Sequence, residues 1–479
     1  MEKMIRIDGI VTAVMLSPDA RNNVYTVVGD KILNAKSELT LDVGDRIACG
    51  CRIEDSRAEL KEIEVLGEAT GKEIEGAIAK LAGLVDTRAN MDRVIEAEKD
   101  KPYLATLKRM AGQIAKAASD FSTAYLAGDP IVVRFHNDGD GVSGAVSLYR
   151  ALAKLQQSLV IGERGVSWVM QRGIEYDSES AYADIFEFNH YNSVRRPLVL
   201  TTDFGTAPGS EGAIIGSKAK YDMIMLDHHP PYDSFPKSYT MHYINTWENG
   251  GDSNFTAGVL CSLFAESISD IHTEDMKRAS LISDYSAFAD RTDAEGQRLA
   301  IVLDYLTSIA GRRDSTIDKL TPAYVQSLIM DKKKFEAAFR YSYDTLMDLL
   351  EIGAKSAKRY QSSRNMAVFV LDFEQLPRAE SGYPLPGRYS SRLQEKLEVA
   401  NGERTLLIVH YGSYITIRLS RAISKETGLL KIISGIVESS EYAESGGGHN
   451  EAASIKVDKD NAKSVLNLLL RELGCLSHS

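Results

Sequence analysis

Acidic residues and histidines follow four short apolar runs in this 479-residue chain. The four segments, each an apolar run with the polar residues after it, are IVVRFHNDGDG, PLVLTTDFG, MIMLDHHPP and SAFADRTD. The acidic residues and histidines in them are His136, Asp138, Asp140, Asp203, Asp227, His228, His229, Asp290 and Asp293. Short apolar runs bounded by polar or glycine-rich segments are typical of buried strands in a parallel sheet. Because ligands bind beyond the carboxyl ends of such strands, we expect these side chains to converge on one edge of the sheet.

The residue types favour a site for divalent cations. Several carboxylates and neutral imidazoles in one pocket are costly unless cations neutralise them. Oxygen and imidazole ligands without cysteine suit Mn²⁺ or Mg²⁺ better than a structural zinc. Two such cations about 4 Å apart can hold both the attacking and the departing oxygen of a phosphodiester. Gly139 and Gly141 would let the loop turn its histidine and aspartates toward one point.

The segment that carries these motifs predicts a doubly wound parallel sheet. Residues 129–293 alternate strand-like runs such as IVVRF, LVLTT and MIMLD with helix-like runs such as AVSLYRALAKLQ and VLCSLFAESI. A regular alternation of strand and helix is typical of an α/β domain with a parallel sheet. We therefore expect residues 129–293 to form the catalytic domain.

The flanking segments have different patterns. Residues 1–68 alternate short β-like runs with turns, which predicts a small OB-like β-barrel. Such a barrel could bind a single strand or dock another protein; both readings stay open, because Tyr25 is the one obvious stacking aromatic. Residues 69–128 predict a helical spacer, residues 294–363 a helical connector or insertion in which Thr321 and Pro322 begin a helix, and residues 364–479 a mixed α/β domain.

Composition sets further limits. The formal net charge is −11, although divalent cations would neutralise several of the acids, so the composition neither demands nor forbids a nucleic-acid partner. The four cysteines show no disulfide framework or zinc spacing, which favours a reducing cytoplasm. No run approaches about 18 consecutive apolar residues, and the first residues alternate like a strand rather than a signal peptide.

The motifs resemble those of a known family. HNDGDG, then a lone aspartate, then DHH and a downstream aspartate resemble the DHH phosphoesterase superfamily. GGGH at residues 446–449, with Ala452 and Ala453, resembles the signature of the companion DHHA1 domain. The resemblance covers roughly residues 120–479 and is greatest to the archaeal RecJ-like nucleases that carry an N-terminal OB-like domain. It implies a DHH catalytic domain at 129–293 and a DHHA1 substrate-binding domain at 364–479.

The resemblance implies a role for each metal ligand. His136 and Asp138 would bind one cation and Asp140 would serve the other, with two Mn²⁺ or Mg²⁺ ions in each active site. Asp203 resembles the carboxylate that bridges the two cations. His228 resembles a further ligand of the second cation.

The last ligand and the residues around it are assigned as follows. Asp290 resembles the remaining ligand of the second cation; Asp284 competes for that place, but Asp290 ends the apolar stretch SAFAD, where the family motif puts it. Asp293 is then a helix cap or a support for the site. His229 would lie near the scissile phosphate, and Asp227 would hold an imidazole or the backbone in place. We count His229 and Asp227 as catalytic residues.

Substrate contacts are expected in the C-terminal domain. Gly446, Gly447 and Gly448 would bring backbone N–H groups close to a phosphate, and His449 would donate to a phosphate oxygen. Without the upstream motifs, this segment would be interpreted as a glycine-rich hairpin turn. Arg418, on the strand-like run YITIRLSR, is a candidate phosphate clamp, on a face that is either the cleft or solvent.

Taken together, the resemblance implies a single-strand-specific exonuclease that hydrolyses DNA or RNA to 5′-mononucleotides, with 3′→5′ polarity, in DNA replication or repair. Its active site would lie between the DHH and DHHA1 domains. One alternative is a phosphodiesterase of oligoribonucleotides or cyclic dinucleotides, which has less need of a strand-tracking barrel. A second is a non-catalytic scaffold, which the full set of ligand types disfavours. A repair helicase or a GINS-type replisome component would be the protein partner, and homo-oligomers stay open.

Overall fold

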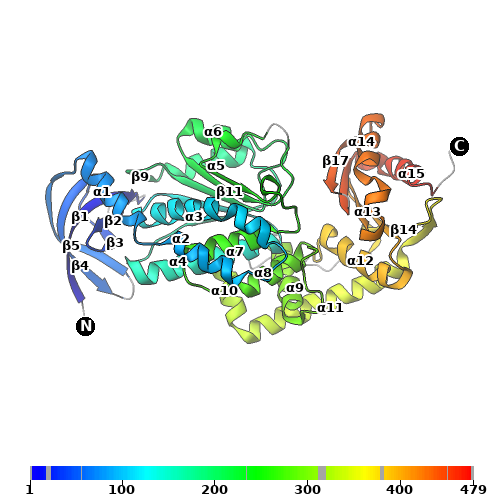
Figure 1. Ribbon diagram of the computed structural model, residues 1–479, viewed down its shortest axis with the longest axis horizontal. Helices are drawn as coiled ribbons and strands as arrows, with labels where there is room; N and C mark the ends of the chain where they lie inside the picture. Colours follow the sequence, from blue (N-terminus) through cyan, green and yellow to red (C-terminus); the bar gives the residue numbers. More distant parts are fainter. Residues whose placement is uncertain are drawn as a thin grey trace. The chain divides into compact units, whose positions relative to one another are not determined.

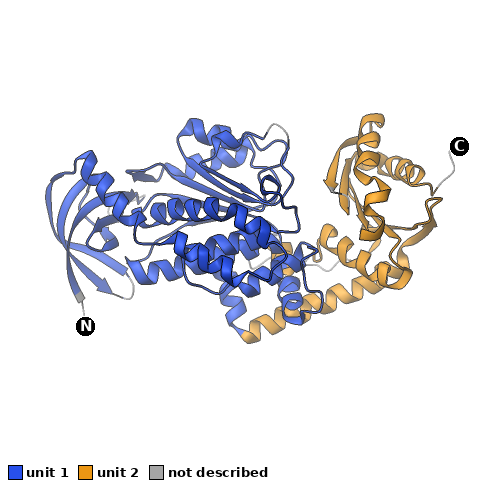
Figure 2. Ribbon diagram, viewed as in Figure 1, with its two compact units in different colours: residues 1–303, 319–331 blue, residues 304–318, 332–479 orange. Residues whose placement is uncertain are grey.

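The computed structural model describes residues 3–17, 23–54, 57–232, 235–310, 320–377, 382–449 and 451–475 (Figure 1). The chain forms two compact units, which Figure 2 shows in separate colours. The first comprises residues 1–303 and 319–331, and the second comprises residues 304–318 and 332–479. No helix in the described ranges has both the length and the apolar character that a membrane span needs.

A five-stranded parallel sheet lies at the centre of the first unit. Its strands, in spatial order, are β12 (His242–Asn245), β11 (Asp222–Asp227), β10 (Leu198–Thr202), β6 (Ile131–His136) and β8 (Ser167–Gln171). Every neighbouring pair is parallel, which confirms the predicted α/β fold. β12 was not among the predicted strands, because its sequence HYIN is short and half polar.

Helices cover both faces of this sheet (Figure 1). α3 (Leu104–Ala127), α4 (Gly139–Leu159) and α7 (Ala257–Ile268) form one apolar core with the sheet, while α5 (Ser178–Phe188) and α6 (Gly212–Ala219) form another. Successive residues of β6 belong to different cores, since adjacent side chains on a strand point to opposite faces. The sheet is therefore doubly wound.

The order of the strands contains one topological switch point. β6 and β10 are neighbours in the sheet, yet the chain first runs from β6 through α4 to β8 on the other side. In open α/β sheets, ligands bind in the crevice at the carboxyl ends of the strands where the order reverses. The crevice beyond β6 and β10 is therefore where a site is expected.

Five N-terminal strands form a ring. They are β1 (Lys3–Met15), β2 (Asn23–Gly29), β3 (Ile32–Ser37), β4 (Asp45–Glu54) and β5 (Arg57–Glu68). The pairings run β1–β2–β3–β5–β4 and back to β1, and only the β3–β5 contact is as short as one residue pair.

The ring is continuous with the rest of the first unit. β7 (Val160–Ile161) pairs with β3, and β9 (Tyr191–Ser193) pairs with β1. Val28 and Ile32 belong to the same core as α3 and α4, and the Thr12 hydroxyl donates to the Ala127 carbonyl at 2.6 Å. The predicted boundaries at residues 68 and 128 therefore separate segments of a single compact unit.

The remaining helices largely follow the predicted signals. They are α1 (Gly71–Ala82), α2 (Thr87–Ala97), α8 (Glu274–Ser283), α9 (Ala294–Ile309) and α10 (Pro322–Met330). Thr70 begins α1 with a capping box in which Glu73 reaches back to the Thr70 N–H. Thr321 caps α10 and Pro322 takes its first turn, as the sequence predicted.

The second unit holds a six-stranded mixed sheet. In spatial order its strands are β13 (Lys358–Gln361), β14 (Ala367–Asp372), β15 (Thr405–Tyr411), β16 (Tyr414–Leu419), β18 (Ala452–Val457) and β17 (Ala443–His449). Its helices are α11 (Lys332–Ser356), α12 (Pro386–Asn401), α13 (Arg421–Thr427), α14 (Leu429–Ser439) and α15 (Ala462–Glu472). The predicted mixed α/β fold of this region is confirmed.

Two segments of this unit differ from what their local sequence suggests. The helical segment was expected to extend to residue 363, but α11 ends at Ser356 and Lys358–Gln361 pairs with β14. Gly446–Gly448 have the composition of a glycine-rich turn, but these residues lie in the edge strand β17 and pair with β18. In both cases, a partner strand distant in sequence supplies the backbone hydrogen bonds that override the local pattern.

A buried ion pair offers a test of this fold. The Arg134 guanidinium bonds both carboxylate oxygens of Asp184, and the two side chains are only 6% and 2% exposed. Arg134→Met leaves the Asp184 charge buried and should reduce the free energy of unfolding by about 3–5 kcal/mol. Urea unfolding followed by the fluorescence of Trp168 and Trp247, both in the first unit, measures this change.

Lys99→Met is the matched control. It breaks an ion pair with Glu96 whose side chains are 61% and 76% exposed, so a change below about 1 kcal/mol is expected. Equal losses in the two variants would contradict the structural role given to Arg134.

Candidate metal centre

The predicted site residues gather at the switch point of the parallel sheet. His136 ends β6, Asp203 directly follows β10, and Asp227 ends β11. His228 and His229 continue from β11 into the loop at the same edge. The carboxyl ends of three adjacent strands thus bring together motifs that are about 90 positions apart in the sequence.

A tight turn delivers the two aspartates of HNDGDG to this edge. Asp138 is the N-cap of α4, and its side chain accepts a hydrogen bond from the Gly141 N–H at 2.9 Å. Asp140 lies in the first turn of the same helix. A Cβ on Gly141 would lie 2.5 Å from the carbonyl oxygen of His136, so the turn requires glycine at this position.

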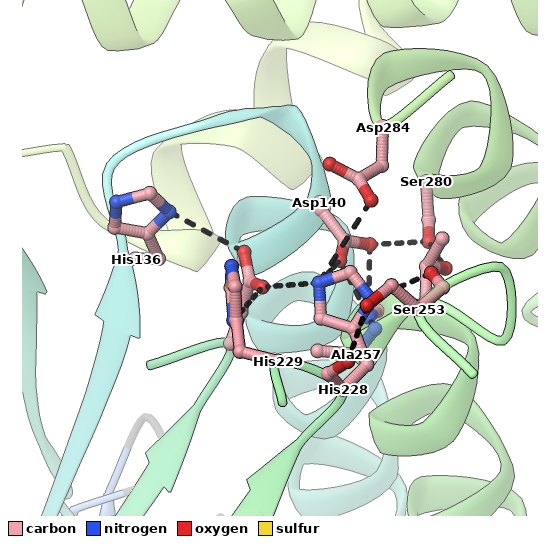
Figure 3. Close-up of polar contacts among 12 residues, drawn as sticks. His136, Asp140, His228, His229, Ser253, Ala257, Ser280 and Asp284 are labelled. Atoms are coloured by element: carbon pink, nitrogen blue, oxygen red, sulfur yellow. Dashed lines mark hydrogen bonds and ion pairs between the residues drawn. The ribbon is translucent and has the colours of Figure 1, made fainter. Parts of the chain in front are cut away.

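Two groups of ligand atoms meet at Asp203. On one side, His136 Nδ1 lies 2.9 Å from Asp138 Oδ2 and 3.4 Å from Asp203 Oδ2. On the other side, His228 Nε2 lies 3.2 Å from Asp203 Oδ1 and 3.7 Å from Asp140 Oδ2 (Figure 3). One carboxylate therefore faces two ligand groups, one with each oxygen.

Asp203 is buried, and within the described structure its carboxylate lacks aligned hydrogen bonds. Its side chain is 1% exposed, and neither oxygen accepts an aligned hydrogen bond from the described residues. Its backbone has a φ of 69°, in the left-handed region that a residue other than glycine rarely adopts. Strain and an unsatisfied buried carboxylate persist where a function requires them, and bound cations would supply the missing partners. The residues therefore fit a divalent metal centre.

The neighbouring ligands are held in orientation. His228 Nδ1 lies 2.8 Å from the Ser253 carbonyl oxygen, so we assign a proton to Nδ1, and Nε2, which faces the carboxylates, is the nitrogen that would bind a cation. Asp140 accepts hydrogen bonds from the Ala257 and Gly258 N–H groups at 3.0 and 2.9 Å and from the Ser280 hydroxyl. The N-terminus of α7 thus stabilises one of the buried acids.

The structure places Asp284, and not Asp290, in the cluster. Asp284 Oδ2 lies 3.8 Å from His228 Nε2, and its ligand atoms group with those of Asp140 (Figure 3). Asp290 is exposed, and its carboxylate accepts hydrogen bonds from the N–H and hydroxyl of Thr292. The choice of Asp290 is corrected here: SAFAD is a turn after α8 rather than a strand, so its end does not point to the sheet edge.

Asp227 organises the DHH loop. Its carboxylate accepts hydrogen bonds from the N–H groups of His228 and His229, from His229 Nδ1 at 2.8 Å and from the Thr206 hydroxyl. Burial works to raise the pKa of Asp227, but the charge and hydrogen bond of His229 prevail and lower it to about 2. Asp227 therefore stays ionised and fixes the His229 imidazole, which is 38% exposed.

Neighbouring carboxylates favour the protonated forms of His136 and His228. Burial works against the charged imidazole of His136, but Asp138 and Asp203 raise its pKa well above the usual value. Burial also works against the charged imidazole of His228, but the carboxylates of Asp203 and Asp284 raise its pKa well above the usual value. Burial is the main cause that raises the pKa of Asp140, and the negative charge of Asp203 raises it further. The cluster thus takes up protons where cations would otherwise sit.

The expected substrate residues lie in the second unit. Arg418 is half-buried on β16, where its Nε donates to the Ser391 hydroxyl at 2.9 Å and its Nη2 to the Gly387 carbonyl at 3.4 Å. Gly446–Gly448 are exposed on β17. The side chain of His449 lies outside the described residues. The predicted alternation of buried and accessible side chains along β16 is only partly present, because Thr416 is as buried as the isoleucines beside it.

Sheet, switch point and cluster define a doubly wound α/β domain whose grouped carboxylates and imidazoles could hold a divalent metal ion. Residues 130–286 match the model of the DHH family, N-terminal domain. Residues 130–286 therefore form a domain of the DHH family, and they include every side chain of the metal cluster.

Individual proteins are similar to larger parts of the chain. The uncharacterized protein MJ1198 of Methanocaldococcus jannaschii is 26% identical over 392 residues, which are 75% of this chain and 50% of that protein. The DHH domain of PF0399, described as a member of the s1p family of ribosomal proteins, is 19% identical, with a TM-score of 0.66 over 78% of this chain and 93% of that one. Exonuclease RecJ bound to manganese has a TM-score of 0.48 and 16% identity over 76% of this chain and 95% of that one.

Asp284 and Asp290 can be told apart by metal binding. Asp284→Asn should weaken Mn²⁺ binding by at least about tenfold, since even supporting residues around metal ligands contribute 10- to 100-fold. Asp290→Asn is the matched control and should leave the affinity unchanged, because its carboxylate bonds Thr292 and no other described residue. Calorimetric titration with Mn²⁺ measures both. A loss in Asp290→Asn alone would reverse the assignment.

Metal binding should also depend on pH. A cation needs the neutral imidazoles of His136 and His228, and their raised pKa values let protons compete above the usual histidine pKa of about 6.5. Mn²⁺ affinity should therefore rise as the pH increases from about 6 through 8, with protons released on binding. Titrations in two buffers of different ionisation enthalpy count those protons. An affinity independent of pH would contradict this charge assignment.

Proposed function

We propose that the protein is a metal-dependent phosphodiesterase that removes 5′-mononucleotides from the end of single-stranded nucleic acid. The observation that carries the proposal is the position of Asp203, buried and unsatisfied between two groups of ligand atoms. His136 and Asp138 would complete one cation site with Asp203. Asp140, His228 and Asp284 would complete the other. Bound cations would stabilise the charge that develops on the phosphodiester and supply hydroxide near neutral pH.

His229 has the geometry of a proton donor to the substrate. It is part-exposed beside the cluster, and Asp227 fixes its Nδ1, so the other ring nitrogen is the one that can meet a phosphate oxygen. Burial opposes the charged form, but Asp227 raises the pKa of His229 above its usual value. A positioned imidazolium of this kind can stabilise the scissile phosphate or protonate the departing oxygen.

The finer properties follow from the motif resemblance. HNDGDG, DHH and GGGH together support a RecJ-like enzyme. The 3′→5′ polarity and the role in DNA replication or repair come from the resemblance to the archaeal subgroup with an N-terminal OB-like domain, since the motifs themselves do not encode polarity. The N-terminal ring is better suited to docking a protein than to tracking a strand. Tyr25 is the one aromatic residue among residues 1–68 and is fully buried, so this ring offers no aromatic stacking surface.

The bridging aspartate provides the main test. Asp203→Asn keeps the size of the side chain but removes the charge between the two ligand groups, so hydrolysis should fall by at least about 10³-fold. The measurement is a time course with Mn²⁺ on single-stranded DNA and RNA of about 30 nucleotides, labelled at either end. Release of mononucleotides from the 3′ end by the wild type supports the proposal.

Other outcomes of this time course are informative. Cleavage restricted to oligonucleotides of a few residues would replace the strand exonuclease with an oligonucleotide phosphodiesterase. No cleavage by the wild type with Mn²⁺ bound would leave a scaffold function. Near-wild-type turnover of Asp203→Asn would contradict the bridging role.

His229 should affect turnover without affecting the metals. Its Nδ1 is engaged by Asp227 and lies 3.9 Å from Asp203, so His229→Ala should leave Mn²⁺ affinity nearly unchanged. Loss of a positioned acid typically reduces kcat by about 10²- to 10⁴-fold. Calorimetry and single-turnover rates on the same preparation separate the two effects. Lost Mn²⁺ binding would make His229 a ligand instead.

A further inference from the structure

A pair of stacked tyrosines lies at the end of the β15–β16 hairpin in the second unit. The ring centroids of Tyr411 and Tyr414 are 5.6 Å apart and the ring planes are inclined by 22°. Tyr411 is part-buried, whereas Tyr414 is 40% exposed. The outer ring of this pair is therefore a flat aromatic surface open to a ligand.

The hairpin holds this aromatic surface in place. Gly412, in the turn between the two tyrosines, has a φ of 51°, and its N–H donates to Glu374 Oε1 at 3.2 Å. Phe373 packs edge-on against the Tyr411 ring, with centroids 6.4 Å apart. A platform that is ordered before binding costs little conformational entropy when a ligand arrives.

The strand register places two cationic side chains on the same sheet face as Tyr414. Tyr414 is paired with Lys456, and Arg418 is paired with Ala452, which in turn is opposite His449. Residues paired across antiparallel strands share a face, and so do positions 414 and 418 of one strand, about 13 Å apart. The face thus runs from the tyrosines to Arg418, the candidate phosphate clamp.

The β17–β18 side of this face allows a close approach, whereas Thr416 on β16 is only 3% exposed. Between the two ends, Thr416 is paired with Ser454, which is opposite Gly447. A Cβ added to Gly447 would meet no atom within 4 Å, so the space above this strand is open within the described structure. The opposite face carries Ile415, Ile417 and Ile455, which are buried in the apolar core with α14 and α15.

The charge of Lys456 is available to an anion. Lys456 forms an ion pair with Glu444 at 2.6 Å, but the two side chains are 48% and 51% exposed. Exposed pairs of this kind contribute little to stability, so a phosphate can take the place of the glutamate. At the other end, Ser391 and Gly387 hold the Arg418 guanidinium, so its charge stays fixed.

We propose that this face binds single-stranded nucleic acid, with a base stacked on Tyr414 and phosphates along the line from Lys456 to Arg418. The inference rests on the proposed function, which makes single strands the substrate. An aromatic surface beside cations suits a strand of any sequence, since every base offers a flat ring and every nucleotide a phosphate. The site would therefore add affinity without strong base preference.

Binding without turnover tests the site. Fluorescence anisotropy with a labelled single strand of about 12 nucleotides, on the full chain in EDTA, measures affinity alone. Tyr414→Ala should weaken binding about 5- to 150-fold, the range that stacking on one aromatic side chain provides, whereas Tyr414→Phe should stay within about twofold. Tyr324→Ala, in the first unit, is the matched control, because Tyr324 is also 40% exposed.

A spectroscopic variant separates stacking from a structural role. Tyr414→Trp should show quenched fluorescence of the new indole on strand binding, and Lys456→Met should reduce the salt dependence of affinity by about 0.7 in the logarithmic slope. Unchanged affinity in Tyr414→Ala, with a wild type that still cleaves single strands, overturns this site but not the proposed function. A wild type that neither binds nor cleaves them overturns both. Quenching by an acidic peptide alone would make this face a protein-binding site.

Discussion

The structure of the first unit depends on one electrostatic constraint: several acids are buried at the switch point of a parallel sheet. Asp140 and Asp203 are almost completely buried, and Asp203 lacks aligned hydrogen bonds from the described residues. Placing like charges this close, in a medium of low dielectric, is unfavourable unless protons or cations balance them. The raised pKa values of His136, His228 and Asp140 express the first solution, and the proposed metal centre is the second.

The surrounding fold reduces the cost of this arrangement. The helix α7 directs two N–H groups at Asp140, and the loop after β11 surrounds Asp227 with donors. Asp203 receives no such support and keeps a left-handed backbone, so it is the acid that depends most on cations. Asp140 and Asp227, which accept hydrogen bonds from N–H groups, orient the site. Asp203, which accepts no aligned hydrogen bond from the described residues, is the carboxylate that would join two cations.

The second unit contributes a different kind of surface. Its sheet buries one face under α14 and α15, while the other face carries Tyr414, Lys456 and Arg418 in register. Cleavage and strand binding would then rest on separate units. Affinity for long strands could change there without any change in the ligands of the metal centre, since all the residues of the cluster lie in the first unit.

The sequence by itself determined the parallel sheet and the convergence of its motifs, because buried strands read as apolar runs and their carboxyl ends must share one edge. It also fixed the places of His136, Asp203 and His228, which directly end or follow strands. Only the tertiary structure decided between Asp284 and Asp290, since neither follows a strand and the path of the turn after α8 sets which carboxylate reaches His228. It also decided that the glycines of GGGH form an edge strand, because their hydrogen-bond partners in β18 and the helix packed beneath them are long-range features that no local pattern encodes.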